Sequence, residues 1–162
     1  MRRRWPLFVL LIPLASANVW AYDPLLAAWK LNLETPHTRF SPGYPAPRSQ
    51  TYTFEAAGAD EVRFRGDTLQ ADGTLVHSEY TARLDGKDYP VTGDPHRDTV
   101  AWRRTKPFIT EGASKKAGQG TNPFSIVIWG GGLLMTITST ETRDGKVYEN
   151  VAVYNKVLEE VR

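Results

Sequence analysis

The chain has 162 residues, of which 41% are hydrophobic and 23% charged, and it contains no cysteine. The lack of cysteine excludes disulfide bonds, thiolate metal sites and cysteine nucleophiles. There are 20 Lys and Arg residues against 18 Asp and Glu residues, and three of the arginines (residues 2–4) lie in a leader that we expect to be removed. The remaining balance of 17 against 18 is not that of a protein that binds nucleic acid.

Residues 1–21 have the three parts of a secretory signal peptide: an arginine-rich start, the apolar stretch Leu7–Leu14, and small residues before a cleavage site. The apolar stretch is far shorter than the roughly 20 residues that a membrane-spanning helix needs. We therefore expect cleavage after Ala21, with Ala17 as the alternative. Residues 22–162 then form one exported domain with no transmembrane segment, either periplasmic or secreted.

The mature sequence consists of short segments rich in Val, Thr, Tyr, Phe and Trp, separated by turn residues, which is typical of strands. Strands are predicted over residues 28–33, 50–55, 61–69, 75–84, 98–104, 108–115, 124–129, 133–140 and 146–157. Asp-Gly pairs at 72–73, 85–86 and 144–145 indicate tight turns, because type I′ turns need positive φ at both central residues. An irregular connection is expected over residues 35–43, which contain two prolines.

The connections are too short for helical crossovers, which argues against a parallel sheet. The predicted fold class is all-β: a single antiparallel up-and-down β-barrel of about 8–10 strands. A sandwich is the alternative, and a barrel removes unpaired strand edges more completely.

Four segments of the chain form a recognisable pattern: W-K-L-N at Trp29–Asn32, F-S-P-G at Phe40–Gly43, Y-T-A-R-L-D-G-K-D-Y-P-V-T-G at Tyr80–Gly93, and N-V-A-V-Y at Asn150–Tyr154. In these segments the chain resembles small exported bacterial proteins of unassigned function that are described as lipocalin-like. It departs from them over Pro107–Met135, where a glycine-rich apolar run replaces a regular hairpin. The resemblance implies a calycin-type barrel, as in lipocalins and fatty-acid-binding proteins, with a tryptophan near its floor. It supplies no catalytic residues.

Aromatic side chains on the predicted strands could line a ligand pocket or fill a closed core. A barrel of about eight strands is only just wide enough to need filling, so periodicity does not separate the two. The candidate ligand-binding residues are Trp29, Tyr52, Phe54, Phe64, Tyr80, Trp102, Arg104 and Tyr154.

Arg104 is the charged member of this set, and it shares a strand face with Trp102. If Trp102 points into the barrel, Arg104 follows it and could pair with a ligand carboxylate. A surface arginine at the strand end is the favoured interpretation, because arginine is mostly exposed unless it is paired.

The three histidines, His37, His77 and His96, show no metal-ligand spacing. His77 and Glu79 share one strand face, where they could form an acid–base pair in a cavity. We favour a solvated outer face, because alternation normally places the apolar residues of a strand inside. No haem-attachment motif, nucleophile elbow or phosphate loop occurs. We therefore expect no catalytic residue, no metal and no cofactor.

The run from Phe124 to Met135 contains three consecutive glycines, Gly130–Gly132. The favoured interpretation is a glycine turn between two buried strands. The alternative is a flexible apolar lip at the mouth of a cavity.

The leading hypothesis is a non-enzymatic protein that binds a small hydrophobic or amphipathic ligand inside the barrel. The first alternative is a structural or interaction module of the cell envelope that binds another protein. The second is a barrel-type isomerase or hydrolase that uses His77 and Glu79. An internal cavity would favour the first hypothesis, and an outward-facing His77 would exclude the enzyme.

Overall fold

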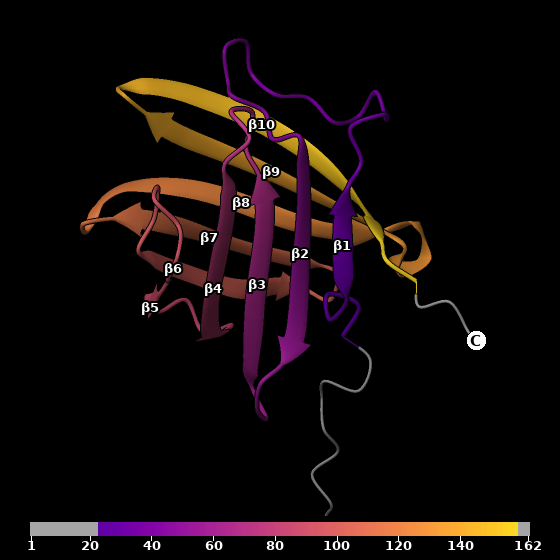
Figure 1. The fold of residues 1–162 in the computed structure, drawn as a ribbon. Helices are drawn as coiled ribbons and strands as arrows, with labels where there is room; N and C mark the ends of the chain where they lie inside the picture. Colours follow the sequence, from indigo (N-terminus) through magenta and orange to yellow (C-terminus); the bar gives the residue numbers. More distant parts are fainter. Residues whose placement is uncertain (1–22, 159–162) are drawn as a thin grey trace, which may run out of the picture.

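The computed structural model describes residues 23–158, so the expected leader at residues 1–21 lies outside the described residues. Ten antiparallel strands form one sheet that curls into a nearly closed barrel (Figure 1). Residues 23–158 contain no α-helix, only the short 3₁₀ turn η2 (Gly130–Gly132). The strands are β1 (Ala28–Leu31), β2 (Ser49–Ala56), β3 (Glu61–Leu69), β4 (Leu75–Arg83), β5 (Tyr89–Pro90), β6 (Thr99–Lys106), β7 (Ile109–Lys116), β8 (Gln119–Trp129), β9 (Leu134–Arg143) and β10 (Lys146–Lys156). The predicted all-β antiparallel barrel is confirmed.

The strand order is that of an up-and-down barrel, β4-β3-β2-β1-β10-β9-β8-β7-β6-β5. The first and last strands pair with each other, with Trp29 of β1 opposite Lys156 of β10. The seam of the barrel, between β4 and the β5–β6 region, is closed by two isolated bridges. In one of them Glu79 and Thr92 exchange backbone hydrogen bonds of 3.0 Å in both directions.

The turns agree with the sequence in part. Asp144 and Gly145, between β9 and β10, both have positive φ (51° and 74°), as a type I′ turn requires. At the other two Asp-Gly pairs only the glycine has positive φ, so those turns are of other kinds. Ala117 and Gly118 form a turn between β7 and β8 that the sequence did not predict. As a result, β8 begins at Gln119, before the predicted start at residue 124.

Inward-facing side chains pack tightly at one end of the barrel, here named the closed end. Trp29, Val62, Trp102 and Met135 are there, each no more than 1% exposed. The Trp29 indole Nε1 donates a 3.0 Å hydrogen bond to the carbonyl of Leu25, so its one polar atom is satisfied. Burial of large apolar side chains of this kind stabilises the fold by roughly 1.5–3 kcal/mol each.

The irregular segment between β1 and β2 reaches the other end of the barrel, here named the mouth. It runs along β10, where Arg39 forms an isolated bridge with Val151. It then arches over the barrel before entering β2 (Figure 1). This agrees with the irregular connection expected over residues 35–43.

Candidate ligand-binding cavity

A cavity of about 170 Å³ lies between the closed end and the mouth. A cavity needs roughly 10–15 Å³ to hold one water molecule, so this cavity is large enough for a small organic molecule. The sequence left open whether the barrel is open or filled. The structure combines both, with a filled closed end and a hollow half toward the mouth.

One side of the cavity is an aromatic wall formed by Tyr52, Phe54, Phe64, Tyr80 and Tyr154. The rings pack on one another: Phe64 stacks on Tyr80 with centroids 4.6 Å apart, and Tyr52 stacks on Tyr154 at 5.3 Å. These five candidates named from the sequence are therefore brought together around one cavity. They meet because side chains alternate between the two faces of a strand, and each of these five lies on the inward face.

The other three candidates do not line the cavity. Trp29 belongs to the closed-end core. Trp102 packs behind the aromatic wall, with its ring 5.7 Å from that of Tyr80. Arg104 forms an ion pair with Asp23 and donates a 2.9 Å hydrogen bond to the carbonyl of Pro107. Arg104 thus lies at the strand end, as in the favoured interpretation.

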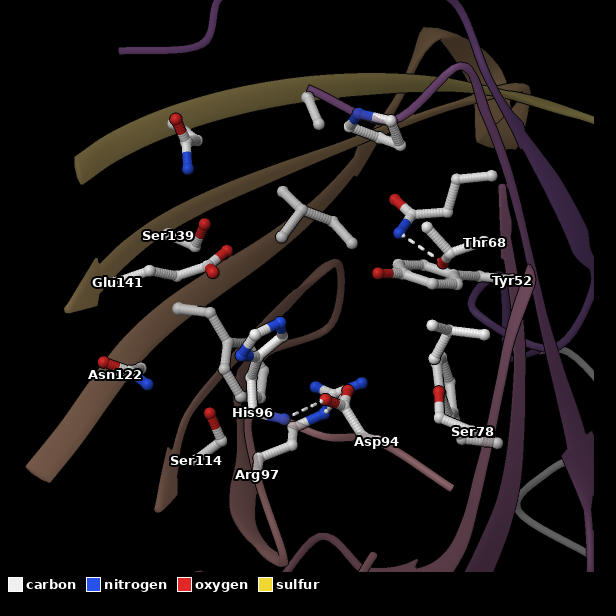
Figure 2. Close-up of a pocket in the computed structure, with 18 of the residues that line it drawn as sticks. Tyr52, Thr68, Ser78, Asp94, His96, Arg97, Ser114, Asn122, Ser139 and Glu141 are labelled. Carbon is white, nitrogen blue, oxygen red and sulfur yellow. Dashed lines mark hydrogen bonds and ion pairs between the residues drawn. The ribbon is translucent and has the colours of Figure 1, made fainter. Parts of the chain in front are cut away.

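A polar wall faces the aromatic one, and the sequence analysis did not identify it. Its polar residues come from β7 to β10 and are Ser114, Asn122, Ser139, Glu141 and Asn150. The same strands also contribute the apolar side chains of Phe124, Ile126, Ile137 and Ala152 to the cavity lining. Strand register makes the wall continuous, because Ser114 lies opposite Asn122 and Ser139 lies opposite Asn150. Figure 2 shows Ser114, Asn122, Ser139 and Glu141 across the cavity from Tyr52, Thr68 and Ser78.

Two asparagines of the polar wall have fixed amide orientations. The Asn150 Oδ1 accepts a 3.0 Å hydrogen bond from the backbone N–H of Ser41, and the Asn122 Oδ1 accepts one of 3.0 Å from Thr142. Each side-chain oxygen is thereby occupied. Asn150 is only 3% exposed, and its Nδ2 has no hydrogen-bond partner among the described residues.

Two ion pairs lie at the mouth. Arg97 Nε is 2.8 Å from Asp94 Oδ2, and an Arg143 NH2 group is 2.8 Å from Glu141 Oε2. The Arg143 group also donates to the Tyr44 hydroxyl at 2.9 Å, which fastens the irregular segment to β9. Burial is the largest single influence on the pKa of Arg97 and lowers it, but the Asp94 carboxylate, Tyr52 and Tyr80 together outweigh burial, so the pKa is raised. Both guanidinium groups are therefore charged and already paired.

The tyrosines of the aromatic wall remain protonated. Burial raises the pKa of Tyr52, Tyr80 and Tyr154 above the ordinary value. The Tyr154 hydroxyl donates to Gln50 Oε1, and Gln50 Nε2 donates to Thr68 at 2.8 Å. Figure 2 shows the Tyr52 hydroxyl pointing into the cavity. These groups are hydrogen-bond donors at neutral pH.

His77 lies on the outer face of β4. Its side chain is 57% exposed and its Nδ1 is 2.7 Å from Asp67 Oδ1, while Glu79 pairs with Arg63 at 3.0 Å. The solvated interpretation of His77 and Glu79 therefore fits the structure, and an enzyme that used this pair would have no cavity around it. His96 does line the cavity, beside Arg97 (Figure 2). Within residues 23–158 no cluster of three or more His, Asp or Glu residues could hold a metal ion.

The triple glycine forms η2 between β8 and β9. All three glycines have positive φ, which allows the sharp reversal. The turn lies at the ends of the strands away from Asn122 and Glu141, so it is not a lip of the cavity. Its neighbours Trp129 and Leu133 are about half exposed.

No known family model matches the chain, and no curated protein matches it. In the part of the chain that the structure describes, no helix has the length and apolar character needed to cross a membrane. A fold does not assign a function by itself, so the functional argument rests on the cavity.

Proposed function

We propose that the protein is an exported, non-enzymatic binding protein that holds a small amphipathic ligand in the barrel cavity. The observation that supports this proposal is the arrangement of an aromatic wall opposite a polar wall around a hollow of about 170 Å³. Small-molecule sites typically combine apolar and aromatic surface with a few placed polar groups. The signal-peptide pattern of residues 1–21 supports export.

The polar wall favours an amphipathic ligand over a purely hydrophobic one. An alkyl chain packed against Ser139, Asn122 and Asn150 would remove water from these groups without replacing its hydrogen bonds, which is unfavourable. The volume also favours a compact molecule over a long acyl chain or a haem. The ligand then places an apolar face on the tyrosine and phenylalanine rings and directs its polar atoms to β7–β10.

Native mass spectrometry of the protein purified from its own periplasm, followed by denaturing extraction, tests this proposal. We expect a co-purifying small molecule in near-stoichiometric amount. The Ser139→Leu variant fills the cavity and is expected to lose the molecule. Thr138→Leu places the same side chain on the outer face of the same strand and is expected to keep it. A protein that carries no small molecule, and binds none from a panel of amphipathic compounds, would contradict the proposal.

A further inference from the structure

Five of the eight large apolar residues that are exposed in the described part of the chain lie at the closed end of the barrel. Isolated apolar residues are common on protein surfaces, but a group of them at one place marks an interaction site. The five residues, here named the apolar rim, are each between 43% and 67% exposed: Phe108, Trp129, Leu133, Val157 and Leu158.

The residues of the apolar rim lie close together although they come from three separate parts of the chain. The backbone N–H of Ile128, next to Trp129, donates a 2.9 Å hydrogen bond to the carbonyl of Phe108. The N–H of Lys156 donates one of 2.9 Å to the carbonyl of Leu133. Figure 1 shows the turn between β8 and β9 beside the end of β10. The glycine turn η2, which takes no part in the cavity, therefore places two large apolar side chains in solvent.

Positive charges without acidic partners surround the apolar rim. Lys106 ends β6 just before Phe108, Lys156 ends β10, and Lys30 lies opposite Asn155. None of these three lysines forms an ion pair with a residue in the described part of the chain. The acidic residues at this end are matched by basic ones, in ion pairs for Asp23, Glu55, Asp60, Glu61 and Asp85 and by the position of Arg103 opposite Glu111. The rim is therefore an apolar surface edged with positive charge.

The N-terminal segment also joins the barrel at this end. Asp23 pairs with Arg104, whose guanidinium donates to the carbonyl of Pro107, the residue before Phe108. The sequence predicts that residues 1–21 are a signal peptide. A signal peptide lies in a membrane until it is cleaved, so export would bring the closed end of the barrel to the bilayer.

We infer that the apolar rim docks the barrel on the surface of a bilayer that contains anionic phospholipid. The rings of Trp129 and Phe108 enter the boundary between headgroups and acyl chains, where aromatic side chains are favoured. The surrounding lysines are attracted to the negatively charged headgroups. The mouth of the barrel then faces away from the membrane. This inference goes beyond the proposed function and does not depend on it, because the rim is separate from the cavity.

A second copy of the chain is the alternative occupant of the rim, and the charges argue against it. In a two-fold dimer the same surface meets itself, so Lys106 and Lys156 of both copies would be brought together. Like charges placed opposite each other across an interface are unfavourable, whereas an anionic lipid surface neutralises them.

Vesicle flotation and tryptophan fluorescence test the inference. Vesicles of phosphatidylcholine and phosphatidylglycerol in equal parts supply an anionic surface, and pure phosphatidylcholine vesicles supply a neutral one. We expect the protein to float with the anionic vesicles and to bind at least about tenfold more weakly to neutral vesicles or in about 0.5 M salt. Trp29 and Trp102 are at most 1% exposed, so we expect a blue shift on vesicle addition that comes from Trp129 and is absent in Trp129→Phe. No binding of the wild-type protein to anionic vesicles would overturn the inference.

A charge placed in the rim locates the contact. Leu133→Glu is expected to weaken binding to anionic vesicles at least about tenfold, because the leucine no longer enters the bilayer. Leu75→Glu makes the same change at the mouth, where Leu75 is 68% exposed, and is expected to bind as the wild-type protein does. Phe108→Glu replaces Leu133→Glu if that variant does not fold. Equal binding by the rim variant and by Leu75→Glu would overturn the inference.

A lysine variant tests the choice of anionic lipid. Lys106→Gln is expected to lower affinity for anionic vesicles about fivefold, while Lys116→Gln, at the mouth end of β7, is expected to leave it unchanged. Salt dependence alone does not identify the lysines, because Glu159 and Glu160 follow Leu158 and lie outside the described residues. Wild-type affinity in Lys106→Gln would overturn the assignment of anionic lipid. Dimers that form without vesicles and are lost in Leu133→Glu, in a protein that binds no vesicles, would assign the rim to a second copy instead.

Discussion

Gly93 lies against the backbone carbonyl oxygen of His77, so close that a Cβ atom at position 93 would stand 1.9 Å from that oxygen. Gly93 has φ of +78°, a conformation that side chains other than glycine rarely adopt. The contact is part of the seam, next to the bridge between Glu79 and Thr92. The barrel closes at this point because the residue there has no side chain.

The Gly93→Ala variant is expected to lower the free energy of unfolding by more than about 2 kcal/mol, because it combines positive-φ strain with a clash against backbone. Gly86→Ala is the matched control, since Gly86 has φ of +80° but no neighbouring heavy atom within 4 Å. This control is expected to cost about 1–2 kcal/mol from backbone strain alone. Urea unfolding of both variants measures the difference, and equal losses would show that the seam tolerates a side chain.

The Glu141→Gln variant is expected to be destabilised by about 1–3 kcal/mol. The change leaves the Arg143 guanidinium, which is only 19% exposed, without its counter-charge. Glu55→Gln breaks an equivalent pair with Arg65 on the outer surface, where the side chains are 47% and 39% exposed. That control is expected to change stability by at most about 1 kcal/mol. Chemical denaturation of the two variants provides the test, and a Glu141→Gln loss no larger than that of the control would contradict it.

The Arg104→Gln variant is expected to weaken the fold by about 1 kcal/mol while leaving ligand affinity unchanged. It breaks the partly buried pair with Asp23 but removes no group from the cavity. Arg103→Gln alters an exposed neighbour on β6 and is expected to have little effect on either property. Thermal unfolding and titration with the small molecule recovered from the wild-type protein measure the two properties separately. Loss of affinity in Arg104→Gln would restore a role for this arginine in binding.

Stability is expected to fall as the pH rises above about 10. Burial raises the pKa of Tyr52, Tyr80 and Tyr154 in the folded state, so the unfolded chain loses these protons first and binds fewer of them. The stabilising contribution is complete below the unfolded pKa of about 10 and is lost as the pH rises through the folded values. Each tyrosine contributes a slope of up to about 1.4 kcal/mol per pH unit.

Urea unfolding between pH 8 and pH 11 measures this dependence. Tyr80→Phe has no hydroxyl to titrate and is expected to show a shallower decline than the wild-type protein. Parallel curves for the two proteins would show that Tyr80 ionises equally in the folded and unfolded states.

Much of the fold could be predicted from the sequence because local rules and tertiary structure agree. Alternation and turn residues gave the approximate strands, and Asp144-Gly145 adopts the expected turn. The early start of β8 was missed because its turn, Ala117-Gly118, places a residue with a side chain at positive φ, where glycine, asparagine or aspartate is more usual. The two-residue strand β5 is too short to show any periodicity.

The aromatic half of the cavity could be predicted, and the polar half could not. Alternation predicts that polar side chains face outward, yet on β9 the inward face changes from Met135 and Ile137 to Ser139, Glu141 and Arg143. This change from apolar to polar inward-facing residues along one strand is a usable signal of a cavity, because a filled apolar core would not place polar side chains there. The Asp94–Arg97 loop offered no such signal, since only the closed barrel brings it to the mouth.

The pairing of β1 with β10 also determines when the barrel can form. Trp29 and Lys156 come from opposite ends of the chain, and their contact joins the first strand to the last. Contacts between residues so far apart in sequence slow folding. The long loop between them must close, at a cost in conformational entropy, before the contacts can stabilise the fold. A chain emerging from the ribosome can form the hairpins β2–β4 early, but Trp29 cannot be enclosed from the β10 side until the final strand has been synthesised. The barrel is therefore completed only after translation has reached its last strand.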